Sequence, residues 1–155
     1  MLGWALAIVV ILAVLSGLWR TRRMLSGMWV GDPGFLSKAG LRSLQLFVAP
    51  GSSWTADGYL LMTESGESDP ISSVPVRLRF APGILGSLTG WLRSKHTMAL
   101  RLESDGPIPF PSDLDLTLVS TAPAVVIHDG GKMYAYLVKD PAASIAAEIE
   151  WKKVI

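Results

Sequence analysis

Residues 125–139, VVIHDGGKMYAYLVK, carry a strong local signal for the fold of this chain. Asp129-Gly130-Gly131 favours a tight turn, because Asp and Gly adopt the positive φ angles that short hairpin loops require. Runs rich in Val, Ile and Tyr flank the turn, and these residue types favour strands. The stretch therefore predicts an antiparallel β-hairpin. No helix is expected after the two glycines, so a phosphate-binding loop is disfavoured.

Apolar and polar side chains alternate with a period of two in many other parts of the chain. In residues 74–80, for example, Val76 and Leu78 face one way, whereas Arg77 and Arg79 face the other. Comparable runs occur at residues 44–48, 59–64, 98–102, 114–118 and 145–151. Together with the hairpin, they predict about eight short antiparallel strands, each with one buried face. We expect a mainly β fold, either an antiparallel β-barrel or a two-sheet sandwich.

A short helix is expected before the first of these strands. Asp32 can cap its N-terminus, Pro33 fits its first position, and Gly40 fits the position just after its end. Because long helices do not alternate with the strands, a parallel α/β fold is disfavoured.

The first residues, 1–19 (MLGWALAIVVILAVLSGLW), contain no charged side chain. A run of this length can cross the ~30 Å hydrocarbon core of a bilayer as a single helix. The sequence therefore predicts a transmembrane helix over 1–19, a basic juxtamembrane linker over 20–26 and the antiparallel β domain over 27–155. The expected anchor residues are aromatic side chains near the two ends of the run and the cations after it: Trp4, Trp19, Arg20, Arg22 and Arg23.

The order of apolar run and charge also predicts an orientation. Cations that follow the run favour a single-pass protein whose C-terminal domain lies on the cytosolic side of the membrane. A cleaved signal peptide normally has its positive charge before the apolar run, so we expect this segment to be retained. A buried core helix normally has a polar face, and this segment has none.

The composition disfavours several classes of function. Without Arg20, Arg22 and Arg23, the chain has 11 basic and 13 acidic residues, whereas a nucleic-acid-binding domain is normally basic. There is no cysteine, and His96 and His128 are isolated, so we expect no metal site and no cofactor. The common hydrolase, nucleotide-binding and metalloprotease motifs do not occur. We therefore do not expect an enzyme.

One segment between two predicted strands, residues 82–95 (PGILGSLTGWLRSK), departs from the alternation. Its apolar side chains fall on one face of a helix, although its glycines weaken such a helix. One interpretation is a short helix or loop that closes an end of the β domain. The other is a contact with a membrane or a partner protein, because Arg93 and Lys95 flank the apolar face. The residues that would make this contact are Ile84, Leu85, Leu88, Trp91 and Leu92.

Gly27-Met28-Trp29 resembles the Gly-x-Trp motif near the first strand of lipocalin-like barrels. In those barrels the Trp plugs one end, often against a basic side chain, so the resemblance implies a plug formed by Gly27 and Trp29. It also implies a cavity for a lipid or another hydrophobic ligand. The expected lining residues include Leu78, Leu100, Leu116 and Ile149. Two features depart from the family: a short helix is expected directly after Trp29, and the C-terminal helix of lipocalins is not expected.

The wider stretch 27–48 is similar to small membrane-anchored virion proteins of large nucleocytoplasmic DNA viruses. In these proteins an apolar N-terminal helix precedes a spaced Trp, Phe, small residue and Leu, and then an all-β domain. The matching positions are Trp29, Phe35, Ala39 and Leu41. The resemblance implies a structural protein of the virion, such as a minor capsid protein, at the internal membrane.

Two functions from different classes follow from these features. The first is a membrane-anchored structural or adaptor protein that links an internal virion membrane to the capsid layer through protein–protein contacts. Its partners would be the lipid bilayer and other structural proteins, and not nucleic acid. The alternative is a membrane-tethered lipocalin-like module that binds a lipid or another hydrophobic ligand. A filled core without a cavity would contradict the alternative.

Overall fold

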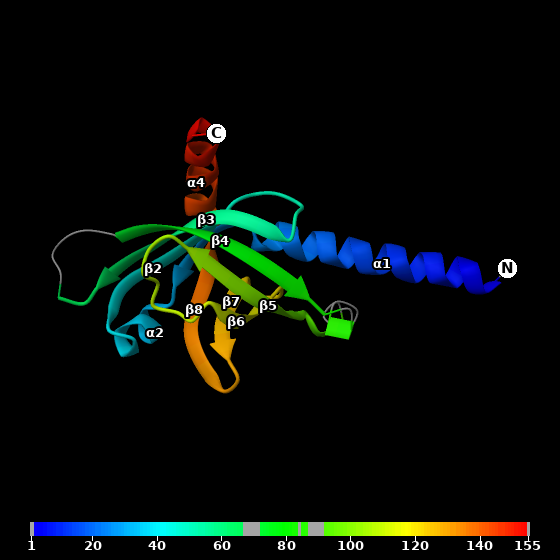
Figure 1. Ribbon diagram of the computed structural model, residues 1–155, viewed down its shortest axis with the longest axis horizontal. Coiled ribbons are helices and arrows are strands. Elements are labelled where there is room, and N and C mark those ends of the chain that lie inside the picture. The colour runs from blue at the N-terminus through cyan, green and yellow to red at the C-terminus, as the bar shows by residue number, and fades with distance from the viewer. Residues whose placement is uncertain (1, 67–71, 84, 87–91, 155) are drawn as a thin grey trace.

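The computed structural model describes residues 2–66, 72–83, 85–86 and 92–154. It consists of a long N-terminal helix, a β-barrel and a C-terminal helix that projects from the barrel (Figure 1). In chain order the elements are α1 (Leu2–Leu25), β1 (Gly27–Gly31), α2 (Pro33–Lys38), β2 (Leu41–Val48), β3 (Thr55–Glu64), β4 (Ser72–Pro82), β5 (Lys95–Ser104), β6 (Asp113–Val119), β7 (Ala124–Asp129), β8 (Lys132–Asp140) and α4 (Pro141–Val154).

The described strands form a closed barrel in the order β1 to β8, so that each strand pairs with its neighbours along the chain. Every pair is antiparallel. The barrel closes where β1 pairs with β8, with Met28 opposite Asp140. Closure satisfies the backbone groups that an edge strand would leave unpaired. The predicted mainly β fold is confirmed, and it is a barrel rather than a sandwich.

The alternation in the sequence corresponds to the interior and the outer surface of the barrel. In β4, Val76 and Leu78 are buried, whereas Arg77 between them is exposed. Inward side chains from all eight strands form one cluster of buried residues. Burial of each large apolar side chain contributes ~1.5–3 kcal/mol relative to leaving it in water, so this cluster is the main source of stability.

The predicted strand at residues 145–151 is wrong, because these residues belong to α4. Asp140 caps the helix with a side-chain hydrogen bond, and Pro141 occupies its first position. The same Asp-Pro signal correctly predicted α2, in which the Asp32 side chain accepts a hydrogen bond from the Phe35 N–H. In α4 an accidental alternation of apolar and charged residues concealed this signal.

Helix α4 packs against the outside of the barrel. Its residue Ala147 belongs to a small apolar cluster with Met28 and Phe47, and the Trp151 ring centroid lies 5.6 Å from that of Phe47. The Ser144 hydroxyl accepts a hydrogen bond from the Met28 N–H at 2.8 Å. The chain therefore does have a C-terminal helix. The sequence predicted that this helix would be absent, and that absence was one of the two expected departures from lipocalin-like barrels.

Strand β1 was not among the predicted strands. Its sequence, GMWVG, does not alternate, because both faces of this strand are covered. Trp29 faces the barrel core, whereas Met28 faces the apolar cluster under α4. A strand buried on both faces has no polar side to give a period-two pattern.

Candidate functional site

Several connecting segments meet at the end of the barrel from which α1 leaves. Because neighbouring strands are antiparallel, residues 49–54 and 120–123 lie at this end, where β1 begins and β8 ends, and so do the described residues between β4 and β5, which are 83, 85–86 and 92–94. We name it the helix end, and we name the opposite end the distal end. In Figure 1, α1 extends away from the helix end, so that the N-terminus lies far from the barrel.

Helix α1 contains a candidate membrane span, Gly3–Leu25, with a mean hydropathy of 1.9. Its aromatic side chains near the two ends are exposed, Trp4 to 80% and Trp19 to 53%. By length and composition this helix can cross a bilayer, and no other described helix meets both criteria. The finding indicates membrane anchoring through α1.

The last turns of α1 are built into the barrel. Leu25 is 1% exposed and belongs to the barrel core. Arg22 is also 1% exposed, and its guanidinium donates hydrogen bonds to the backbone carbonyls of Ala49, at 3.0 Å, and Ser53. The same guanidinium lies 5.8 Å from the Phe80 ring centroid. The segment predicted as a linker is therefore mostly helical, and Arg22 faces the protein instead of lipid headgroups.

The other two cations of this cluster stay on the surface. Arg20 and Arg23 are exposed, and the Arg23 guanidinium lies 5.4 Å from the Trp19 ring centroid. Aromatic and cationic side chains of this kind are enriched where a helix passes through the lipid headgroups. Arg20, Arg23 and Trp19 thus keep the positions that an interfacial anchor needs.

Trp29 is buried at the helix end, with 1% of its surface exposed. Its indole Nε1–H donates a hydrogen bond to the Leu25 carbonyl oxygen at 2.8 Å. The Lys139 ammonium lies 5.4 Å from the indole centroid and donates a hydrogen bond to the Met24 carbonyl oxygen at 3.0 Å. Burial lowers the pKa of Lys139, and the charge of Glu148 acts in the opposite direction. A buried Trp beside a basic side chain is the arrangement that the Gly-x-Trp resemblance implies.

Gly27 turns the chain from α1 into β1. Its φ angle is +116°, and a Cβ at this position would lie 2.8 Å from the Ser144 hydroxyl oxygen. Both the angle and the close approach require glycine. The Ser144 hydroxyl accepts the Met28 N–H and donates to the Asp140 carbonyl at 2.6 Å, so α4 is fixed against the same turn.

A polar pair joins α1 to β5. The Thr21 hydroxyl donates to the Gly17 carbonyl at 2.9 Å and lies 3.3 Å from His96 Nδ1. Burial, followed by the positive charge of Arg20, lowers the pKa of His96. Neither Thr21 nor Lys139 was identified from the sequence, and His96 was expected to be isolated.

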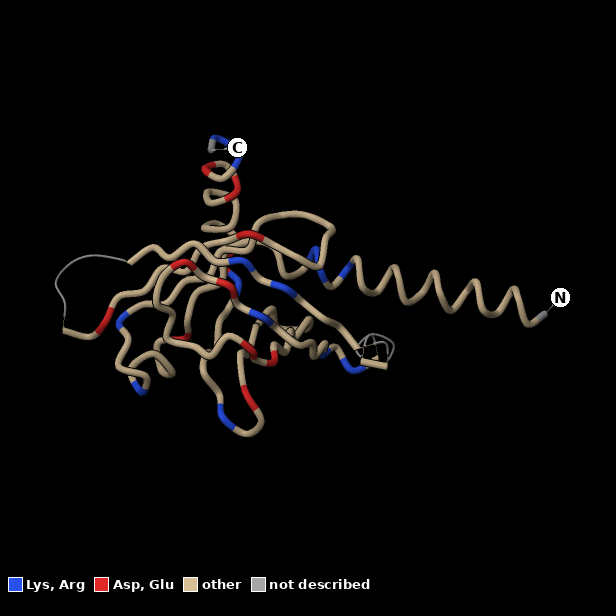
Figure 2. Tube along the Cα trace, viewed as in Figure 1, with Lys and Arg blue, Asp and Glu red and all other residues tan. Residues whose placement is uncertain are grey.

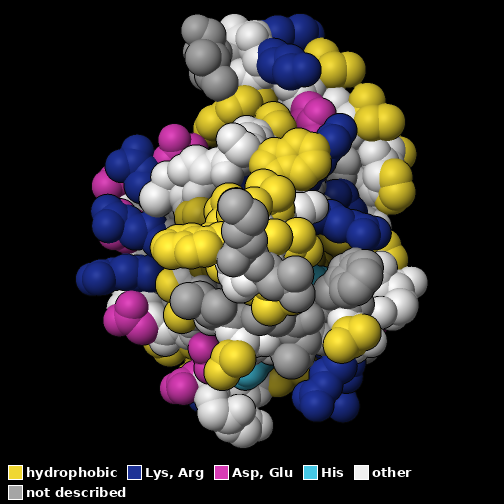
Figure 3. All heavy atoms as spheres, turned by 90° about the vertical axis from the view of Figure 1, so that its right-hand side faces the viewer, with side chains coloured by type: hydrophobic (Ala, Val, Ile, Leu, Met, Phe, Trp, Pro, Cys, Tyr) yellow, Lys and Arg dark blue, Asp and Glu magenta, His cyan; other side chains and the backbone are white. Residues whose placement is uncertain are grey.

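The segment between β4 and β5 presents apolar side chains at the helix end. Leu85 and Leu92 are 78% and 80% exposed. The other residues of the predicted contact, Ile84, Leu88 and Trp91, lie outside the described residues. Figure 3 views the molecule from the side to which α1 points, so that the apolar side chains near the centre include those of α1 seen end on, and both basic and acidic side chains lie around them.

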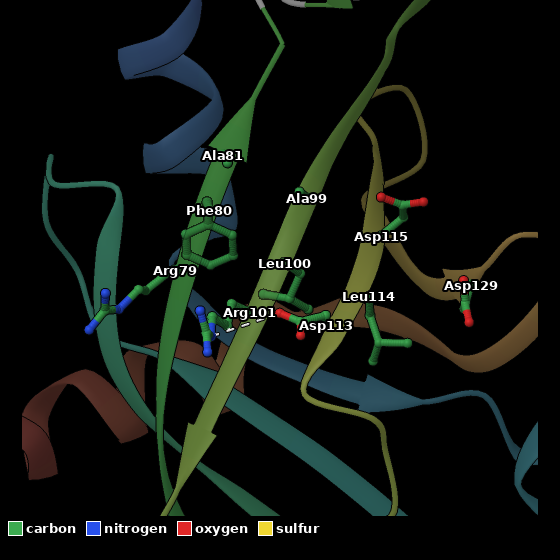
Figure 4. Close-up of a pocket in the computed structure, with 10 residues that line it drawn as sticks. All are labelled: Arg79, Phe80, Ala81, Ala99, Leu100, Arg101, Asp113, Leu114, Asp115 and Asp129. Carbon is green, nitrogen blue, oxygen red and sulfur yellow. Dashed lines mark ion pairs between the residues drawn. The ribbon is translucent and has the colours of Figure 1, made fainter.

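A shallow hollow lies on the outer surface of β4, β5 and β6 (Figure 4). Ala81 and Ala99 line it, together with Arg101 and Asp113, which form an exposed ion pair with an N–O distance of 3.8 Å. Exposed pairs of this kind contribute ~0–1 kcal/mol. Among the described residues, no group of three or more His, Cys, Asp and Glu side chains could hold a metal ion. The helix end is therefore the better candidate for a functional site.

The fold and this end together define a β-barrel protein with an N-terminal candidate membrane helix. No family model and no solved structure matches the chain. It is similar to "Uncharacterized protein EP152R" of African swine fever virus. The South African tick isolate's protein is 26% identical over 123 residues, which cover 79% of this chain and 75% of that protein. The Malawian tick isolate's protein is 26% identical over 128 residues, 79% and 74% of the two chains. The similarity supports a protein of a large DNA virus.

Proposed function

We propose that this protein is a membrane-anchored structural or adaptor component of the virion, which links an internal membrane to the capsid layer through protein–protein contacts. The observation that carries the proposal is the continuous path of α1 from its exposed apolar part into the barrel core at Leu25. The similarity to proteins of a large DNA virus supports the viral setting.

A rigid connection between α1 and the barrel suits a structural component better than a flexible linker would. Ordering a flexible linker costs ~1–2 kcal/mol of backbone entropy per residue, and this cost would weaken binding to a protein layer. Here α1 is helical up to the barrel, and Arg22 bonds to Ala49 and Ser53 at its base. The barrel is therefore held in one orientation relative to α1 before any partner binds.

The distal end is the surface that a neighbouring protein layer would contact. It carries α2, the β7–β8 hairpin and the exposed side chains of Glu64, Asp105 and Asp129. With α1 across an internal membrane and the barrel on its cytosolic side, this end points away from the bilayer. The cytosolic side of such a membrane becomes the side that faces the capsid.

The alternative of a lipocalin-like ligand-binding module receives less support. Leu78, Leu100 and Leu116 do face the interior, but they belong to the same packed cluster of buried residues as Trp29. The prediction for Ile149 is wrong, because this residue lies on α4 and is 52% exposed. A continuous cluster of buried side chains in the interior favours a scaffold over a ligand carrier.

Cross-linking of the native protein in purified particles tests the proposal. With a lysine-reactive reagent and mass spectrometry, we expect Lys38 and Lys132 at the distal end to cross-link to coat subunits. Lys95, at the helix end, is the internal control and should give no such product. We also expect the protein to resist extraction by high salt and to be released by detergent. Absence from purified particles, or cross-links confined to this chain, would contradict the structural role.

A further inference from the structure

Helix α1 can cross a bilayer only if the helix end of the barrel touches that bilayer. The exposed Trp19, Arg20 and Arg23 mark where α1 leaves the bilayer, because aromatic and cationic side chains are enriched in the headgroup layer. Thr21 and Arg22, which lie between these residues, are already buried in the protein. The barrel therefore begins where the membrane span ends, so the helix end must lie in the headgroup layer.

The connecting segments at the helix end have the composition of a surface that meets lipid. The described residues of these segments, 49–54, 83, 85–86, 92–94 and 120–123, include no Asp or Glu. Leu85 and Leu92, in the segment between β4 and β5, are 78% and 80% exposed. Exposed apolar side chains next to cations are the pattern of interfacial membrane segments.

Four exposed cations lie at the same end of the barrel as these leucines. Arg20 and Arg23 lie at the base of α1, and Arg93 and Lys95 follow Leu92. Asp140, the acidic residue at the end of β8, is engaged in capping α4. An anionic leaflet attracts each such cation within about one Debye length.

The distal end has a different charge pattern, as Figure 2 shows. Exposed acidic residues lie there, among them Glu64 and Asp129, together with the basic residues Lys38 and Lys132. A surface that carries both acidic and basic side chains has no net attraction to anionic lipid, whereas the cations at the helix end are attracted to it. The charge distribution therefore favours contact of the same end from which α1 leaves.

We propose that the helix end is a second lipid-binding surface of this protein. Leu85 and Leu92 enter the interface of the leaflet that α1 crosses, and Arg93 and Lys95 bind anionic lipid headgroups. The occupant is the bilayer and not another protein, because α1 holds this end in the headgroup layer. The inference rests on the membrane anchoring in the proposed function.

The absence of cysteine allows a direct test with single-cysteine variants of the full-length chain. Leu85→Cys and Leu92→Cys report on the proposed surface after labelling with an environment-sensitive fluorophore. Met133→Cys is the matched control, because this residue is 46% exposed on the β7–β8 hairpin at the distal end. Leu12→Cys, at a 60% exposed position within α1, reports separately on the anchor. Each variant is reconstituted into vesicles that contain phosphatidylserine and a quencher-labelled lipid.

We expect a blue-shifted emission and lipid quenching at positions 85 and 92, and neither change at position 133. Quenching at position 12 without quenching at 85 and 92 would overturn this inference and leave the anchor intact. No quenching at position 12 would overturn both the anchor and this inference. Labels at 85 and 92 that stay in water in vesicles but become protected when coat proteins are added would identify a protein-binding surface instead.

The role of the cations is tested with the double variant Arg93→Glu/Lys95→Glu in the Leu92→Cys background. We expect weaker quenching at position 92 in vesicles with phosphatidylserine, and a similar reduction for the parent in uncharged vesicles, because α1 alone still holds this end near the headgroups. Lys132→Glu at the distal end is the control and should leave the quenching unchanged. Equal quenching in all of these samples would overturn the headgroup contact. Circular dichroism of each variant establishes that the barrel is folded.

Discussion

The Arg22 guanidinium on α1 donates a hydrogen bond to the Ala49 carbonyl oxygen, just after β2, with an N–O distance of 3.0 Å. This bond joins the candidate membrane helix to the barrel. The side chain is 1% exposed, and its Nη1 atom has no hydrogen-bond partner among the described residues. A buried cation without a carboxylate is stable only if carbonyls and rings around it replace water. Ala49, Ser53 and Phe80 supply that replacement.

Replacement of Arg22 is expected to weaken the barrel as well as its link to α1. Arg22→Ala removes two hydrogen bonds and leaves buried carbonyls unpaired, so the free energy of unfolding should fall by ~2–4 kcal/mol. Denaturant unfolding of the full chain in detergent, followed by tryptophan fluorescence, measures the change. Arg20→Ala, at an exposed site, should change stability by less than ~0.5 kcal/mol at pH 8. Equal effects of the two variants would contradict the buried role of Arg22.

The turn at Gly27 should tolerate no side chain. Gly27→Ala combines a φ angle of +116° with a Cβ 2.8 Å from the Ser144 oxygen, so we expect a loss of ~1–3 kcal/mol of stability. Gly131→Ala is the matched control, because nothing lies within 4 Å of its Cβ position. Thermal melting of both variants provides the comparison. A Gly27→Ala protein as stable as the control would show that the turn adapts.

Trp29 should contribute both packing and a hydrogen bond. Trp29→Phe keeps a ring but loses the Nε1–H bond to the Leu25 carbonyl, so we expect a loss of ~1–3 kcal/mol. Trp29→Ala also leaves a cavity, and the loss should reach ~3–5 kcal/mol. Trp4→Phe, at an 80% exposed position, is the control and should have little effect in detergent. A near-neutral Trp29→Ala variant would rule out a structural plug.

Protonation of His96 should destabilise the folded protein. Its folded-state pKa lies below the ordinary value of 6.5, because burial and Arg20 disfavour the charged form. Between the two pKa values the unfolded chain binds more protons than the folded chain, so stability falls as the pH is lowered through 6.5. Below the folded-state pKa the contribution of His96 becomes constant.

The variant His96→Gln isolates this effect. Relative to the parent, it should lose less stability between pH 7 and acid pH, as measured by unfolding in detergent at a series of pH values. An identical pH profile for the parent and His96→Gln would refute the assignment to His96.

The strands could be predicted wherever one face of a strand is buried and the other is in water. Val76 and Arg77 on β4 show this period-two pattern, and the Asp129-Gly130-Gly131 turn is determined by local φ angles. Strand β1 could not be found this way, because Met28 and Trp29 are buried on opposite faces. The error at residues 145–151 had the opposite cause, since a false alternation concealed a capped helix.

The candidate site was predicted in part. Trp29 was identified from its motif, but its basic neighbour Lys139 is 110 positions away in the sequence and no local pattern connects them. The burial of Arg22 was missed, although residues 18–25 contain no Gly or Pro that would end a helix. That absence is the signal for a helix that continues into the barrel.

The sequence by itself determined the apolar N-terminal helix, the mainly β character of the remainder and the turn at residues 129–131. These features depend on hydrophobicity, periodicity and backbone angles, which act over a few neighbouring residues. Only the tertiary structure decided that β1 closes the barrel against β8 and that Arg22 is buried. Both depend on contacts between segments far apart in the chain, where burial outweighs local preference. Closure also brings Leu92 and Arg93 to the end of the barrel from which α1 leaves.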